Sequence, residues 1–160
     1  AFVVGKVSEG DSLIDRALFL NPNFAWGWLF SGWVHAWSGE AEEAISRVTR
    51  AINFSPNDPH LYSMRRAIGF AHFIAGRYGP AIAESNLDTT SLQNEFIAVA
   101  TAAASAGQLH EMEVGRAALT RLLTLVPGLN VSNLRRFFPI QRDVDYSRWE
   151  AGLTLVGLPK

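Results

Sequence analysis

The stretch GWVHAWSGEAEEAI, Gly32 to Ile45, decides the fold, because it returns further along the chain as GFAHFIAGRYGPAI, Gly69 to Ile82. The two segments align without a gap at a constant offset of 37 residues. The matched identical residues are Gly32 and Gly69, His35 and His72, Gly39 and Gly76, Ala44 and Ala81, and Ile45 and Ile82. Self-similarity at a period of roughly 20 to 50 residues is typical of proteins built from stacked repeats. The sequence therefore predicts a repeated structural unit.

Composition narrows the class of protein and its partners. Apolar residues make up 48% of the 160 residues and charged residues 18%, which is typical of an ordered domain. A formal net charge of −1 gives no electrostatic signal for nucleic acid or an anionic membrane, so we expect neither as a partner. The absence of cysteine excludes disulfides and thiolate metal sites and agrees with a reducing compartment. We expect a cytoplasmic protein without a membrane span.

Glycine and proline divide the chain into helix pairs with helical apolar spacing. Residues 11 to 20 read as a helix preceded by a turn at Ser8 to Asp11, and Ala1 to Val7 as the end of an earlier helix. The expected turns inside the three pairs are Ser38-Gly39, Gly76 and Gly107-Gln108. The expected units are a half repeat at 1–22, repeats at 23–58, 59–90 and 91–128, and a cap at 129–160. Because the first unit is half a pair, we expect a fragment of a larger protein.

The tail breaks the repeat pattern. Residues 131 to 137 predict a short helix ending before Pro139, and residues 143 to 156 predict a longer one. In the longer helix we expect one buried face carrying Val144, Trp149, Leu153 and Val156. A stack of repeats needs an atypical last element over its open end, so we interpret the tail as a helical cap.

The spacings resemble the tetratricopeptide repeat, with Ala25 as the first position of a unit of about 34 residues. The signature positions met in the first repeat are Trp28, Gly32, Gly39, Ala44, Ala51 and Pro56. The second repeat keeps Gly69, Gly76 and Ala81. The resemblance implies an all-α, right-handed solenoid of antiparallel helix pairs with a C-terminal helical cap.

A finer resemblance covers the segments LNPNFAWGW, SPNDPHLY, PGLNVSNL and GLTLVGLPK. They look like the C-terminal repeat region of bacterial class III adenylate or guanylate cyclases and related multidomain regulators. This implies a regulatory or partner-binding module attached to an effector domain. The residues here hold no phosphate loop and no suitable pair of metal-binding carboxylates, so we expect any cyclase activity to belong to another part of the parent protein.

The tetratricopeptide resemblance places the first helix of each pair along a concave groove. The residues expected to bind a partner there are Trp26, Leu29, Trp33, Trp37, Arg66, Phe70 and Phe73. Separations of seven and four residues independently bring Trp26, Trp33 and Trp37 onto one side of their helix. Such a surface suits a peptide with apolar anchors. The alternative that the rings pack against neighbouring repeats or the cap stays open.

No other constellation predicts chemistry. His35 and His72 occupy equivalent positions, but zinc takes about four ligands and no cysteine or acidic pair completes a set. We expect no metal, no cofactor and no catalytic residue in these 160 residues. The predicted function is therefore non-enzymatic recognition of a protein or peptide, regulating an effector on the same chain. The alternatives are a self-association element, giving a homodimer, and a small-molecule sensing module.

Overall fold

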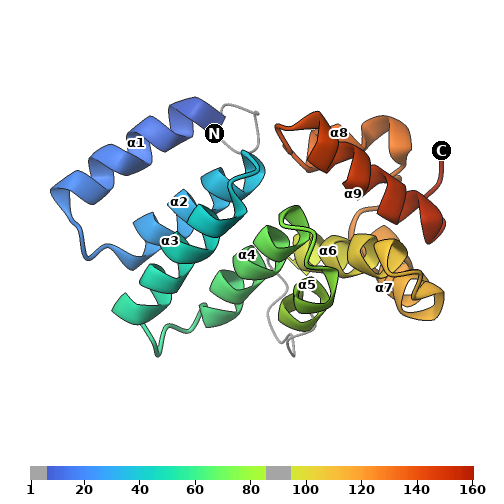
Figure 1. Cartoon of the computed structure of the whole chain (residues 1–160), viewed down its shortest axis with the longest axis horizontal. Coiled ribbons are helices and arrows are strands. Elements are labelled where there is room, and N and C mark those ends of the chain that lie inside the picture. Colours follow the sequence, from blue (N-terminus) through green and yellow to red (C-terminus); the bar gives the residue numbers. More distant parts are fainter. Residues whose placement is uncertain (1–6, 86–94) are drawn as a thin grey trace.

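The computed structural model describes residues 7–85 and 95–160, and this part of the chain is all-α. It contains nine α-helices, one short 3-10 helix and no strand (Figure 1). The helices are α1 Val7–Leu20, α2 Ala25–Trp37, α3 Ala41–Phe54, α4 Leu61–Ile74, α5 Tyr78–Ser85, α6 Glu95–Gln108, α7 Met112–Leu125, α8 Leu134–Phe137 and α9 Asp143–Leu155. The 3-10 helix η2, Val131–Asn133, leads directly into α8. None of these helices is long and apolar enough to cross a membrane.

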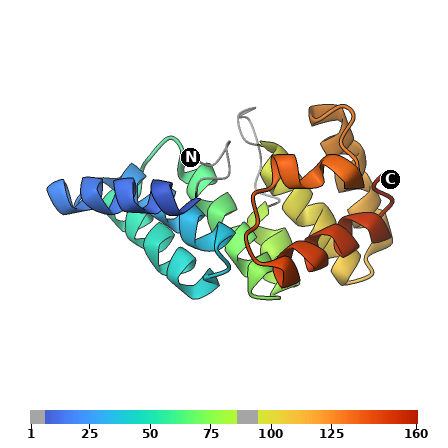
Figure 2. The same ribbon diagram turned by 90° about the horizontal axis from the view of Figure 1, so that it is seen from above.

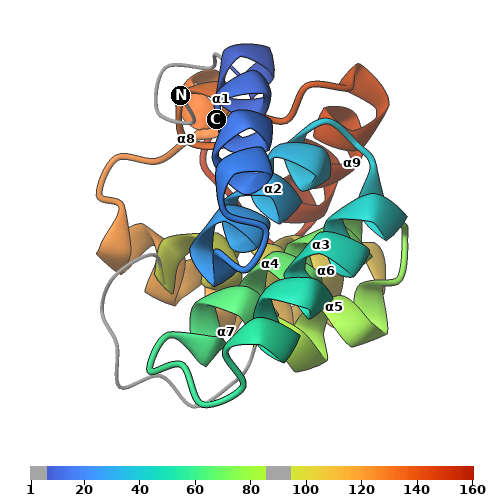
Figure 3. The ribbon, with the colours of Figure 1, turned by 90° about the vertical axis from the view of Figure 1, so that its left-hand side faces the viewer.

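The first seven helices pack mainly on their neighbours in the chain. Helix α2 lies against α3, α4 against α5, and α6 against α7, while α3 contacts α4 and α5 contacts α6. Helix α1, which belongs to none of these three pairs, lies over α2, as the end-on view shows (Figure 3). Helices α8 and α9 lie at the opposite end of the molecule from α1 (Figure 2). Three helix hairpins thus stand side by side, and α9 lies across α6, with Trp149 also contacting α4.

The first two hairpin turns are built as the sequence predicts. Gly39 and Gly76 have φ of 86° and 75°, in the left-handed region that glycine adopts without a steric penalty. In each turn the amide after the glycine reaches back into the preceding helix. Glu40 N–H donates to the His35 carbonyl at 2.8 Å, and Arg77 N–H donates to the His72 carbonyl at 2.9 Å. The two repeated glycines therefore end equivalent helices in the same way.

The expected third turn at Gly107-Gln108 is wrong. Helix α6 runs through Gly107 to Gln108, and the left-handed residue is His110, with φ of 59°. The N–H of Glu111 donates to the Ala106 carbonyl at 2.9 Å, so the hydrogen bonding matches that of the first two turns. His110 lies 34 residues after Gly76. Gly107 has a different role, because helix α9 crosses α6 at this position.

We expect His110→Gly to raise the free energy of unfolding by about 1 kcal/mol, because a β-carbon is unfavourable in the left-handed region. Urea denaturation followed by circular dichroism measures the change. The control is His110→Ala, which removes the imidazole and keeps the β-carbon, and it should give no such gain. A glycine variant no more stable than the alanine variant would contradict the prediction.

Two further expectations about helices are corrected, and several lie outside the described residues. The turn expected at Ser8 to Asp11 is part of α1, where Gly10 is buried. A single glycine costs a helix about 1 kcal/mol, so packing on α2 is enough to carry the helix through it. In α9, Val144 is 56% exposed and does not share the buried face. Expectations for residues 1–6 and 86–94 fall outside the part that the structure describes.

Candidate binding face

The structure buries five of the seven side chains expected to bind a partner. Trp26 and Trp33 of α2 are partly exposed. The buried ones lie on α2 and α4 and have exposed fractions between 0 and 3%; they are Leu29, Trp37, Arg66, Phe70 and Phe73. On the neighbouring α6, Thr101, Ala104 and Ser105 are also buried, and Ile97 is partly exposed. The expected face is therefore divided into a covered part and a partly open part.

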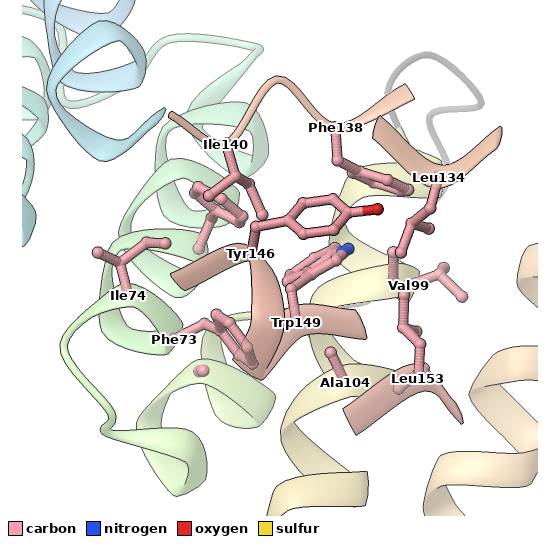
Figure 4. Close-up of a cluster of buried hydrophobic side chains, with 14 of the residues drawn as sticks. Phe73, Ile74, Val99, Ala104, Leu134, Phe138, Ile140, Tyr146, Trp149 and Leu153 are labelled. Carbon is pink, nitrogen blue, oxygen red and sulfur yellow. The ribbon is translucent and has the colours of Figure 1, made fainter. Parts of the chain in front are cut away.

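The C-terminal segment, residues 129–159, covers one part of the face. Trp149 of α9 is fully buried, with its ring centroid 5.4 Å from that of Phe70 and 4.9 Å from that of Phe73. Phe138, which follows α8, lies 5.0 Å from Trp149. Figure 4 shows the indole between Phe73 and Phe138, with Leu153 further along α9. Phe70 and Phe73 thus pack against the chain's own tail.

Two glycines allow α9 to approach α6 closely. A β-carbon built on Gly107 would lie 2.0 Å from the Gly152 carbonyl oxygen, and one on Gly152 would lie 2.3 Å from the Ala104 carbonyl oxygen. Real β-carbons do not approach backbone atoms at such distances, so both positions must be glycine at this separation of the helices. The crossing explains why Gly107 lies inside a helix and not in a turn.

Arg148 of α9 and Arg142, the residue before α9, also bind the ends of the earlier helices. Arg148 donates to the Ile74 carbonyl at 2.8 Å, and Arg142 donates to the Gly39 carbonyl at 3.0 Å. Both arginines pair with the fully buried carboxylate of Asp145, Arg142 at 3.2 Å. Carbonyls at a helix C-terminus lack partners within their helix and carry partial negative charge, which favours arginine. The segment is therefore tied to the C-terminal ends of α2 and α4.

Arg148 interacts with both Asp145 and Tyr78. Burial, the largest single influence, lowers the pKa of Arg148, but the hydrogen bonds and charge interactions with Asp145 and Tyr78 together raise it above its ordinary value. This group was not among the residues expected from the sequence. A signal for it exists, because Arg142 precedes Asp145 by three residues and Arg148 follows it by three, a spacing at which helical neighbours pair.

The partly open part of the face is an aromatic strip, which we define as Trp26, Phe30 and Trp33 of α2 with His60 and Tyr62 beside them. Trp26 contacts Phe30 at 5.9 Å between ring centroids and His60 at 5.2 Å. Phe30 is 41% exposed, and Trp33 stacks on the buried Trp37 at 5.7 Å. The C-terminal segment does not bury these three α2 rings, which therefore present aromatic surface to solvent.

Arg66 is not placed to bind the carboxylate of a ligand. Its guanidinium lies 4.8 Å from the centre of the Tyr62 ring, and the side chain is 2% exposed. Burial lowers the pKa of Arg66 from its ordinary value. The guanidinium makes a cation-π contact with the tyrosine ring and is not presented at the surface. This geometry favours apolar recognition at the strip.

Each of the two equivalent histidines contacts the side chain of the residue five positions later, just after its hairpin glycine. His35 Nδ1 lies 2.5 Å from the Glu40 carboxylate, and His72 Nδ1 accepts from Arg77 Nε at 2.9 Å. Burial, and then the neighbouring Arg77, lower the pKa of His72, in agreement with a neutral ring that accepts a hydrogen bond. In residues 7–85 and 95–160, no group of three or more histidine, aspartate or glutamate side chains is placed to hold a metal ion.

Comparison with known proteins adds no family to this description. Neither a scan against protein-family models nor a search of curated proteins matched the chain.

Proposed function

We propose that the chain is a tetratricopeptide-like solenoid module that binds a protein or peptide and has no enzymatic activity of its own. The support for the architecture is the set of three side-by-side helix hairpins, whose turns share one hydrogen-bonding pattern at Gly39, Gly76 and His110. Following the resemblance to cyclase regulators, the module would regulate an effector domain of the same parent protein in the bacterial cytoplasm.

The observation that carries the proposal is the partial exposure of neighbouring aromatic rings on α2. Trp26, Phe30 and Trp33 follow one another along one side of the helix, and none of them is buried. Exposed aromatic surface on a folded domain commonly marks an interaction site, and aromatic side chains supply much of the binding energy in such sites. Because the rings carry no charge, the ligand is a peptide with apolar anchor residues.

Acrylamide quenching of tryptophan fluorescence tests the accessibility that this function needs. Of the five tryptophans, Trp37 and Trp149 are buried, so we expect a protected and an accessible population. The double substitution Trp26→Ala with Trp33→Ala should remove most of the accessible signal. Complete protection of the wild-type fluorescence would overturn the proposal.

A synthetic array of random peptides tests binding itself. Wild-type protein should bind a subset enriched in aromatic and aliphatic residues, and the Trp26→Ala, Trp33→Ala variant should lose that binding. Phe54→Ala is the control, because Phe54 is as exposed as Phe30 of the strip, at 41%, but lies at the end of α3, outside the aromatic strip. Binding that survives the tryptophan substitutions, or no binding by the wild type, would count against the proposal.

A second candidate function is self-association through α1. Phe19 and Leu20 are 84% and 74% exposed, which is unusual for such large apolar side chains. A dimer formed there should dissociate on Phe19→Ser, as light scattering would show, and should leave the tryptophans of the aromatic strip quenchable. A monomeric wild type would exclude this candidate.

A further inference from the structure

We propose that the C-terminal segment can be exchanged between two copies of this chain, so that α9 of one copy docks on α4 and α6 of the other. The occupant of the covered part of the face is then the same segment, supplied by a second copy. This inference does not depend on peptide binding at the aromatic strip, which involves α2 and other residues.

The contacts of α9 favour exchange because they are made with helices distant in the chain. Helix α9 packs chiefly on α6 and only lightly on α7, the long helix that precedes it. Outside the segment, the rings that Trp149 contacts lie on α4, and Arg142 and Arg148 reach the carbonyls of Gly39 and Ile74. None of these contacts requires the segment to belong to the same chain. A second copy can supply them without any new interface.

The segment is also bonded within itself, so it can move as one unit. Val131 N–H donates to the Pro159 carbonyl at 2.9 Å and joins the beginning of the segment to its end. Arg135 of α8 pairs with Asp143 of α9 at 2.7 Å and lies 3.7 Å from the centre of the Tyr146 ring. These bonds persist when the whole segment is displaced from the rest of the molecule.

A hinge is present where the segment begins. Pro127 and Gly128 are exposed after α7, and Gly128 has φ of 82°. A β-carbon built on Gly128 would meet no atom within 4 Å. The hydrogen bonds that the Gly128 carbonyl accepts come from Asn130 at 3.2 Å and Asn133 at 2.9 Å, both within the segment itself. A glycine in open space can take other backbone angles without a clash. The chain can therefore redirect the segment by changing dihedral angles at this one position.

Docking of α9 buries the Trp149 indole N–H without a hydrogen-bond partner among the described residues. Burying an unpaired donor opposes docking, because the donor loses its hydrogen bond to water. The docked arrangement is therefore stabilised by burial of the Trp149 ring, by the close crossing at the glycines and by the arginine contacts, and the unpaired indole N–H weakens it.

A second copy is the fitting partner because the face accepts a specific arrangement of side chains. The face packs against the indole of Trp149 and needs a glycine at position 152, where α6 approaches. It also accepts hydrogen bonds from Arg142 and Arg148 at the ends of earlier helices. Another copy of this chain carries that arrangement by identity. An unrelated apolar helix with a side chain at the glycine position would meet the backbone of Ala104.

Complementation between two defective variants tests the exchange. Gly152→Leu disables the segment but leaves the face on α6 intact, whereas Gly107→Leu blocks the face but leaves the segment intact. Each variant alone should be a monomer of 17.6 kDa with an undocked segment. An equimolar mixture should form a heterodimer of twice that mass in light scattering, with one tryptophan regaining protection from acrylamide.

The control mixture is Gly152→Leu with Trp149→Ala, in which both segments are defective and no heterodimer should form. Absence of a heterodimer from the first mixture, with helical circular dichroism retained in both variants, overturns the exchange. If either leucine variant loses its helical signal, the wild type is refolded from urea at high and at low concentration. Dimer formation only at high concentration, reduced by Gly107→Ala, supports the proposal, and a monomer at both concentrations overturns it.

Discussion

Replacing Gly152 with alanine is expected to lower the free energy of unfolding by about 3 kcal/mol, at the upper end of the usual cost of overpacking. The added methyl group would lie 2.3 Å from the Ala104 carbonyl oxygen, and this obstacle is backbone, which cannot rotate away as a side chain can. Helix α9 must then move off α6 and loosen the packing of Trp149. The better helix propensity of alanine returns about 1 kcal/mol, which the steric cost exceeds.

Urea denaturation of Gly152→Ala and three further variants separates this crossing from a general effect of glycine replacement. Gly107→Ala should be as harmful as Gly152→Ala, and the double variant should lose less than the sum, because one separation of the helices relieves both clashes. Gly79→Ala in α5 is the matched control. Its β-carbon would meet nothing within 4 Å, so the variant should be neutral or slightly more stable. A Gly152→Ala protein as stable as the control would contradict the crossing.

The hairpins could be predicted from the sequence because their determinants are local. Gly39 and Gly76 interrupt helical spacing at points where only a left-handed residue continues the chain into a second helix, and the structure confirms both turns. His110 could not be recognised by residue type, because histidine takes the same conformation there without the glycine signal. Its distance of 34 residues from Gly76 was the available signal. The turn was wrongly predicted at Gly107, because the sequence does not distinguish a glycine required for a helix crossing from a glycine required for a turn.

The exposure of the candidate face could not be predicted, because it depends on contacts between residues distant in the chain. Helical spacing brings Phe70 and Phe73 onto α4 but does not reveal that Trp149 covers them. Even the orientation of α9 was only partly predicted. Trp149 and Leu153 are buried as expected, but Val144 precedes Trp149 by five residues, a separation that leaves the shared face of a helix. Asp145 takes the buried position because two arginines neutralise it.

Trp149→Ala is expected to lower the free energy of unfolding by about 4 kcal/mol, the usual cost of truncating a buried aromatic side chain to alanine. The indole is fully buried and contacts rings from α4 and from the chain preceding α9, so its removal leaves a cavity that no single element can close. Part of the loss should be regained in Trp149→Phe. Phenylalanine fills most of the cavity and also removes the indole N–H that lacks a partner among the described residues.

Trp28→Ala is the control that distinguishes burial in the core from the loss of any tryptophan. Trp28 is partly exposed, stacks with the Arg50 guanidinium at 4.2 Å and donates to the Pro22 carbonyl at 2.7 Å. Its loss should cost about 1 to 2 kcal/mol, since it removes one hydrogen bond and the cation-π contacts with Arg50 and, at 5.3 Å, with Arg47. Equal losses in the two variants would mean that α9 contributes no more than a surface contact. A larger loss for Trp149, with near-ultraviolet circular dichroism reduced before the helical signal, would show that the tail fixes the packing of α4 and α6.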